Sequence, residues 1–127
     1  MADLPPPNIL TPILVVDDDS DVRRVVTWAL EDAGFMVATA ADGAAACTCA
    51  ASQRPAVVVL DVGLPDADST LVAARLRDAC GSTLPILVIT ADGRAAAKAA
   101  RVGAYAYLHK PFEDDALVAA VRLGLGR

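Results

Sequence analysis

The sequence has 127 residues, 55% of them hydrophobic, and a formal net charge of −5 at neutral pH. This length allows one domain with a sizeable core and excludes two. Because the net charge is negative and the basic residues do not cluster, the chain by itself is not expected to bind nucleic acid or a membrane surface.

Residues 1–12 are rich in proline and are expected to form an extended arm. They contain no basic region followed by an apolar run, so they do not resemble a secretion signal, and no later stretch is long enough to span a bilayer. The three cysteines include no Cys-x-x-Cys pair, which favours free thiols in a reducing compartment. We therefore expect a cytoplasmic protein with one domain over residues 13–123 and a short tail over 124–127.

The first expected strand is Ile13–Val16, four apolar residues that lead directly into Asp17–Asp19. A helical pattern follows and ends at Gly34. The predicted buried face of this helix consists of Val22, Val25, Val26, Ala29, Leu30 and Ala33. Its polar face carries the only tryptophan of the chain, Trp28.

The middle of the chain predicts three more strands. A short strand over Met36–Ala40 is expected at the sheet edge, and an alanine-rich helix follows over about 42–53. The four apolar residues before Asp61, Val57–Leu60, lie between turn residues, which is typical of a strand buried on both faces. Another such strand is expected at Ile86–Thr90.

Three helices and one strand complete the pattern. Asp68 or Ser69 can cap a helix that precedes the strand at 86–90. The predicted buried face of that helix consists of Leu71, Val72, Leu76 and Ala79. A helix over Arg94–Val102 would bury almost only alanine, and we expect it to be the loosest helix. The last strand, Tyr105–His109, ends at Lys110, and a final helix follows.

Five strands thus alternate with five helices, and connections of this length predict right-handed crossovers. The expected fold class is α/β, a single doubly wound five-stranded parallel sheet with helices on both faces. Because parallel strands end at one edge of the sheet, five side chains should converge there. They are Asp17, Asp18, Asp61, Thr90 and Lys110. Open α/β sheets bind their ligands at this edge.

The chemistry of these groups indicates phosphoryl transfer. Three carboxylates so close together need a counter-cation to stay ionised, and oxygen-only ligands favour Mg²⁺. A carboxylate such as Asp61 can attack a phosphoryl group to give an acyl phosphate. Lys110, the Thr90 hydroxyl and the backbone N–H of Ala91 could each neutralise part of the charge on the transferred group.

Four segments carry a resemblance to a known family: Val15–Asp19, Val59–Pro65, Ile89–Ala91 and Tyr107–Phe112. In this order and spacing they resemble the receiver domain of two-component response regulators, from residue 13 to about residue 123. The resemblance implies a flavodoxin-like sheet with the strand order 2-1-3-4-5. It also implies a signalling protein rather than an enzyme.

The resemblance assigns roles to residues at the strand ends. Asp61 would accept a phosphoryl group from the phosphohistidine of a sensor histidine kinase or a histidine phosphotransfer protein. Asp18 and Asp61 would bind Mg²⁺ directly, and Asp17 would bind it through a water molecule. The backbone carbonyl of Gly63 would be the remaining protein ligand. Lys110 would pair with the phosphoryl group.

By the same resemblance, Thr90 and Tyr107 would form a switch, in which the hydroxyl moves toward the phosphoryl group and the ring turns inward. A static edge-strand aromatic is the alternative for Tyr107. The Lys110–Pro111 bond is a candidate for the cis form. The helix at 94–102, the last strand and the last helix would form a surface for homodimerisation or partner binding. Trp28 could mark a docking surface for the phosphodonor, although half-burial against a neighbouring loop is the commoner outcome.

Two other classes of function stay open. A phosphorylation-independent interaction module would share the fold, but loss of an acid or of Lys110 would be expected in it. A phosphohydrolase with an aspartyl-phosphate intermediate would need a second acid to activate water and a substrate-binding cap. Asp19 is expected to be only a helix cap. Ser69 stands where the family usually has glycine.

Overall fold

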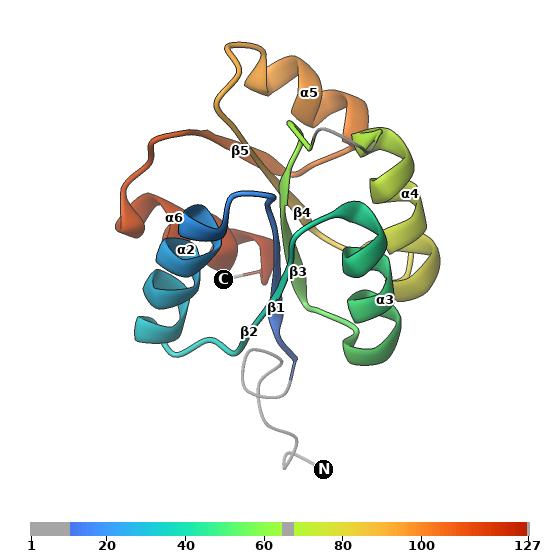
Figure 1. Cartoon of the computed structure of the whole chain (residues 1–127), viewed down its shortest axis with the longest axis horizontal. Coiled ribbons are helices and arrows are strands. Elements are labelled where there is room, and N and C mark those ends of the chain that lie inside the picture. Colours follow the sequence, from blue (N-terminus) through green and yellow to red (C-terminus); the bar gives the residue numbers. More distant parts are fainter. Residues whose placement is uncertain (1–10, 65–67, 127) are drawn as a thin grey trace.

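The computed structural model describes residues 11–64 and 68–126, in which five strands alternate with five helices (Figure 1). The strands are β1 (Ile13–Val16), β2 (Val37–Ala40), β3 (Val57–Asp61), β4 (Ile86–Thr90) and β5 (Ala106–His109). The helices are α2 (Ser20–Asp32), α3 (Gly43–Gln53), α4 (Ser69–Cys80), α5 (Ala95–Val102) and α6 (Asp114–Gly124). None of these helices is long and apolar enough to cross a bilayer. The predicted arm lies outside the described residues, except for its last two positions.

The strands pair in the order β2-β1-β3-β4-β5, and every pairing is parallel. The predicted fold class and strand order are therefore confirmed. β1, β3 and β4 are buried at every position, as expected for strands covered by helices on both faces. β5 alternates between half-buried and exposed positions because it forms one edge of the sheet.

Two apolar layers hold the helices against the sheet (Figure 1). On one face, α2 and α6 pack against the strands through side chains that include Leu30 and Leu117. On the other face, α3, α4 and α5 do so through side chains that include Ala50 and Leu76. Removing this apolar surface from water stabilises the fold by roughly 25 cal/mol per Å². This packing also keeps the ends of the strands in register.

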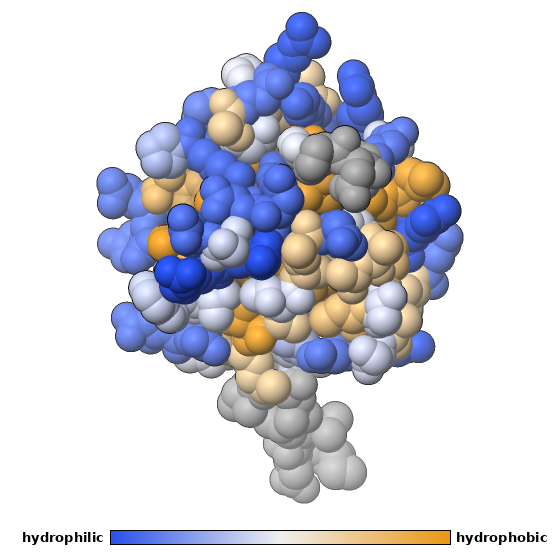
Figure 2. Space-filling model, in the orientation of Figure 1, coloured by the Kyte–Doolittle hydropathy of each residue, from blue (hydrophilic) through white to orange (hydrophobic). Residues whose placement is uncertain are grey.

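The surface over these two layers differs in polarity. Figure 2 shows a mostly hydrophilic surface over α2 and a paler, more apolar surface over α3 and α4. The sequence of α3 explains the second observation, because Gly43–Gln53 contains no charged residue and is rich in alanine. The uncharged α3 therefore differs chemically from the charged α2 on the other side of the sheet.

Two side chains that the helical pattern placed in the core are exposed. Val25 in α2 retains 52% of its accessible surface and Leu71 in α4 retains 49%. The neighbouring residue fills the buried position in each helix, Val26 in α2 and Val72 in α4. A period of 3.6 residues directs adjacent side chains about 100° apart, so in these two pairs one side chain faces the sheet and the other points to the surface.

Candidate functional site

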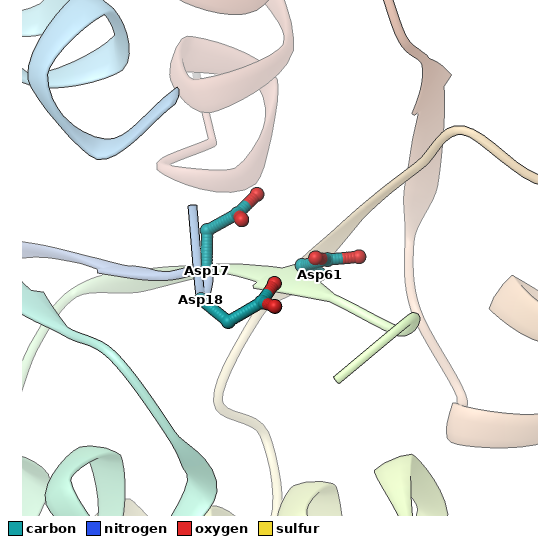
Figure 3. A group of neighbouring side chains, drawn as sticks. All are labelled: Asp17, Asp18 and Asp61. Carbon is teal, nitrogen blue, oxygen red and sulfur yellow. The ribbon is translucent and has the colours of Figure 1, made fainter. Parts of the chain in front are cut away.

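Three carboxylates meet at the carboxyl edge of the sheet (Figure 3). Asp17 and Asp18 follow β1, Asp61 ends β3, and β1 pairs directly with β3. One oxygen from each of the three acids lies within 4.8 Å of the others. Asp17 and Asp61 are buried, whereas Asp18 is exposed. The structure thus brings together the three acids named from the sequence.

The ammonium of Lys110 lies beside these acids. Lys110 follows β5, and its Nζ lies 2.7 Å from Asp17 Oδ2 and 3.5 Å from Asp61 Oδ2. Burial alone would lower the pKa of Lys110, but the hydrogen bond to Asp17 and the charges of both carboxylates raise it above its ordinary value. Lys110 therefore stays charged and neutralises part of the cluster. The bond from Lys110 to Pro111 is cis, as the sequence indicated.

Both oxygens of the Asp61 carboxylate have a partner in the site. Burial and the negative charge of Asp17 raise the pKa of the Asp61 carboxyl, whereas the hydrogen bond from the Gly63 N–H and the charge of Lys110 lower it. The net effect is a raised pKa. The Gly63 N–H donates to Asp61 Oδ1 at 2.8 Å, and Oδ2 faces Lys110. A Cβ at position 63 would lie 3.3 Å from Asp61 Oδ1, so glycine permits this close approach. The result is a basic carboxylate with both oxygens oriented.

The residues after β4 occupy the next strand end. Thr90 is 1% exposed, and its hydroxyl accepts a hydrogen bond from the N–H of Asp92 at 3.0 Å. Ala91 is exposed and lines a groove that Lys110 also lines. Tyr107 lies on β5 and is 48% exposed, so its ring is not buried with the acids in this conformation.

The donor set of the cluster fits a hard divalent cation. Carboxylate oxygens without a histidine or cysteine among them suit Mg²⁺ better than zinc or copper. Three carboxylates beside one ammonium leave an excess of negative charge that a divalent ion would neutralise. Asp17, Asp18 and Asp61 are the residues that would hold it.

Among the polar contacts near the site that were not predicted from the sequence, two involve cations on helices. Arg23 in α2 donates to the backbone carbonyl of Asp17 at 2.6 Å, and Lys98 in α5 pairs with Asp92 at 3.0 Å. Each contact joins a helix to the loop before it, where helical spacing rules do not apply. In the sequence, such a contact is indicated only by a polar or oppositely charged residue a few positions before the helix. This pattern occurs too often to identify the pairs that actually form.

Asp19 and Asp68 act as helix caps. The Asp19 side chain accepts bonds from the N–H groups of Asp21 and Val22 at the start of α2. The Asp68 side chain accepts one from Thr70 at the start of α4. Both caps agree with the sequence, and Asp19 is the acid of its loop that stays outside the cluster.

Comparisons with known proteins agree with this geometry. A family model described as the response regulator receiver domain matches residues 13–122. The transcriptional regulatory protein PrrA of Mycobacterium tuberculosis is 44% identical over 119 residues, which cover 91% of this chain and 50% of PrrA. The chain thus spans about half the length of the curated relatives PrrA and MprA.

Solved structures of the same shape come from several bacteria. The chemotaxis protein CheY4 of Vibrio cholerae is 31% identical, with a TM-score of 0.81 over 90% of this chain and 98% of CheY4. NtrX of Brucella abortus, solved in complex with ATP, is 31% identical with a TM-score of 0.84 over 92% of this chain and 27% of NtrX.

Proposed function

The chain belongs to the response regulator receiver domain family of two-component systems, and from this premise we propose that it is a phosphorelay receiver whose phosphoryl acceptor is Asp61. The observation that supports this role most is the position of Asp61, buried, 3.5 Å from the Lys110 ammonium and grouped with two further acids. The donor would be a sensor histidine kinase or a histidine phosphotransfer protein in the cytoplasm.

In the proposed reaction, a carboxylate oxygen of Asp61 attacks the phosphorus of a phosphohistidine. The new O–P bond forms as the P–N bond breaks, and the imidazole leaves with the electron pair of that bond. The product is an acyl phosphate on Asp61. Lys110, the Thr90 hydroxyl and the Ala91 N–H would bind oxygens of the transferred group, each from a neighbouring strand end.

Mg²⁺ is the proposed cofactor. Asp18 and Asp61 would bind it directly, Asp17 through a water molecule and Gly63 through its carbonyl. When bound, the ion neutralises negative charge on the carboxylates and on the phosphoryl oxygens. Three carboxylate oxygens within 4.8 Å of one another support this assignment.

The output would come from a rearrangement around β4 and β5. The Thr90 hydroxyl would leave the N–H of Asp92 for the phosphoryl group, and the exposed ring of Tyr107 would turn inward. The surface formed by α5, β5 and α6 would then change and control a partner or a homodimer. The half-exposed pattern of β5 supports this choice of element.

The test is incubation with MgCl₂ and acetyl phosphate, followed by intact mass measurement. We expect one added phosphoryl group, which is absent when EDTA replaces MgCl₂ and absent in Asp61→Asn. Asp19→Asn is the matched control, because Asp19 lies in the same loop and its side chain only caps α2. An unlabelled wild type with a normal fold would favour the interaction module, and phosphate release far beyond one equivalent would favour the phosphohydrolase.

A further inference from the structure

One peptide unit beside the acid cluster is held at both of its polar groups. The unit joins Val62 to Gly63, directly after Asp61. Its N–H, which belongs to Gly63, donates to Asp61 Oδ1 at 2.8 Å. Its carbonyl, which belongs to Val62, accepts a hydrogen bond from the Ser69 hydroxyl at 3.1 Å. Because a peptide unit is planar, a bond that fixes its carbonyl also fixes the direction of its N–H.

Ser69 reaches this carbonyl from a fixed position. It is the first residue of α4, and its side chain is half-buried. The Asp68 side chain caps the start of the helix by accepting a hydrogen bond from the N–H of Thr70. On the other side of the loop, the N–H of Val62 donates to the Ile89 carbonyl of β4 at 3.3 Å. The hydroxyl therefore ties this end of the loop to α4, while β4 holds it from the opposite side.

The neighbouring strand end has the same type of bond without such support. The N–H of Asp19 donates to Asp17 Oδ1 at 2.9 Å, again two residues after the acid. Among the described residues, no hydrogen bond is made to the carbonyl of that peptide unit, which belongs to Asp18. The Asp17 carboxylate lies 2.7 Å from the Lys110 ammonium, whereas Asp61 lies 3.5 Å from it. The orientation of Asp61 therefore depends more on its peptide partner.

We propose that Ser69 is a positioning residue for phosphoryl transfer, because its hydroxyl holds this peptide unit and the N–H of the unit orients the Asp61 carboxylate for attack on phosphorus. The proposal rests on the proposed function, since it takes Asp61 as the acceptor. A nucleophile that is already oriented needs less ordering to reach the transition state. A hydrogen bond to the carbonyl also polarises the peptide unit and strengthens the bond that its N–H donates. Glycine, which the family usually has at position 69, has no side chain to make this contact.

A hollow beside this contact determines how large the effect of Ser69 should be. It has a volume of about 240 Å³, and its lining includes Val62, Ser69 and Lys98. A water molecule occupies about 30 Å³, so water can enter the hollow and replace a lost hydroxyl at the Val62 carbonyl. Such a water is not attached to α4 and would restore the hydrogen bond without fixing the direction of the peptide unit. Loss of the hydroxyl should therefore slow phosphoryl transfer and not abolish it.

Ser69→Ala tests the proposal, because it removes the hydroxyl and keeps a good helix former at the start of α4. The first measurement is amide hydrogen exchange by NMR, in protein without MgCl₂ or acetyl phosphate. We expect exchange at Gly63 to become about fivefold faster, because this amide loses the support of one hydrogen bond. Exchange at Asp19, whose N–H makes the same type of bond at the neighbouring strand end, should stay unchanged.

The second measurement is the initial rate of phosphorylation by acetyl phosphate with MgCl₂, followed by intact mass. This rate should also fall about fivefold in Ser69→Ala. Ser69→Thr keeps the hydroxyl, and the hollow beside residue 69 leaves space for the additional methyl group. Threonine should therefore restore both the slow exchange at Gly63 and the rate.

Thr48→Ala is the matched control, because the Thr48 hydroxyl donates to the Ala44 carbonyl at the same distance, 3.1 Å, within α3. This variant should change neither the exchange at Gly63 nor the rate. Unchanged exchange or an unchanged rate in Ser69→Ala would overturn the proposal, as would equal losses in Thr48→Ala or no recovery in Ser69→Thr. If the wild type is labelled and Ser69→Ala is labelled equally fast, only this proposal fails. An unlabelled wild type overturns the proposed function, and this proposal with it.

Discussion

The strands at the centre of the sheet are more deeply buried than β5 at its edge. β1 and β3 are buried at every position and lead directly into Asp17 and Asp61. β5 is half exposed, and the neighbouring α5 buries only Ala95, Ala99 and Val102. The acids thus stand on the firmest strands, whereas the predicted switch includes the least buried strand. Transfer chemistry needs fixed geometry, and a switch needs a low cost of rearrangement.

Polar contacts at both ends of α5 partly replace the missing apolar area. At its C-terminal end, Arg77 of α4 donates to the carbonyls of Val102 at 2.6 Å and Gly103 at 2.9 Å. Toward its N-terminal end, Lys98 pairs with Asp92 at 3.0 Å, and the hydrogen bond from Lys98 lowers the pKa of that carboxyl. Such bonds can be replaced by bonds to water, so releasing α5 should cost less than releasing a helix that buries leucine side chains.

The largest expected difference is in the loss of stability caused by a substitution in β3 and by one in β5. Leu60→Ala in β3 should lower the free energy of unfolding by about 3 kcal/mol, because it leaves a cavity at a fully buried position. Tyr107→Ala in β5 should cost less than about 1 kcal/mol, because that side chain is 48% exposed. Urea unfolding measures both. Equal costs would show that the edge is held as firmly as the centre.

The next effect concerns the charge at the centre. Lys110→Met should destabilise the protein by about 2 kcal/mol, because among the described residues no other cation pairs with buried Asp17. Asp17→Asn should remove most of this penalty, so a double-mutant cycle should give a coupling energy of about 1–2 kcal/mol. Additive losses in urea unfolding would mean that the 2.7 Å contact does not stabilise the fold.

A hydrogen bond from Tyr105 to α6 fixes the start of β5, and this contact should weaken at alkaline pH. The Tyr105 hydroxyl donates to the Ala120 carbonyl at 2.6 Å, and burial raises the pKa of Tyr105 to about 12. Because the folded state favours the protonated phenol, its stabilisation is complete below pH about 10 and is lost as pH rises toward about 12. The loss should be about 1–2 kcal/mol.

Tyr105→Phe isolates this contribution from other groups that titrate at high pH. Its stability in urea should change less than that of the wild type between about pH 9 and 11.5. Parallel curves for the two proteins would show that ionisation of Tyr105 does not weaken this edge.

The smallest effect should be local to α5. Arg77→Ala should speed amide hydrogen exchange in α5 by about fivefold, equivalent to about 1 kcal/mol, and leave exchange in α2 unchanged. Arg75→Ala is the matched control, because Arg75 lies on the same helix and lines a groove between α3 and α4 instead. Equal exchange in both variants would mean that Arg77 does not restrain α5.

Much of the site followed from a simple pattern in the sequence. Apolar runs that end in Asp17, Asp61, Thr90 and Lys110 predict parallel strands, and parallel strands bring their ends to one edge. This reasoning placed Lys110 beside Asp61, although the two residues are 49 positions apart. It needs only burial and chain direction, which local residue types determine.

The exposure of helix side chains and the contacts between helices could not be predicted in this way, because they depend on how the helices pack. Val25 and Leu71 belong to apolar runs, yet each is exposed because its neighbour occupies the core position. The contact of Arg77 with the end of α5 joins residues 25 positions apart that no spacing rule relates. Such contacts form only when two helices lie side by side.

The sequence by itself determined the strands, their parallel direction and the charged residues at their ends, because strand burial and chain direction are encoded locally. The strand order followed only from the resemblance to receiver domains. Only the tertiary structure decided which side chains on each helix remain exposed and how α5 is restrained. The physical reason is that these features depend on the rotation and separation of packed elements, and many weak contacts from distant parts of the chain set both.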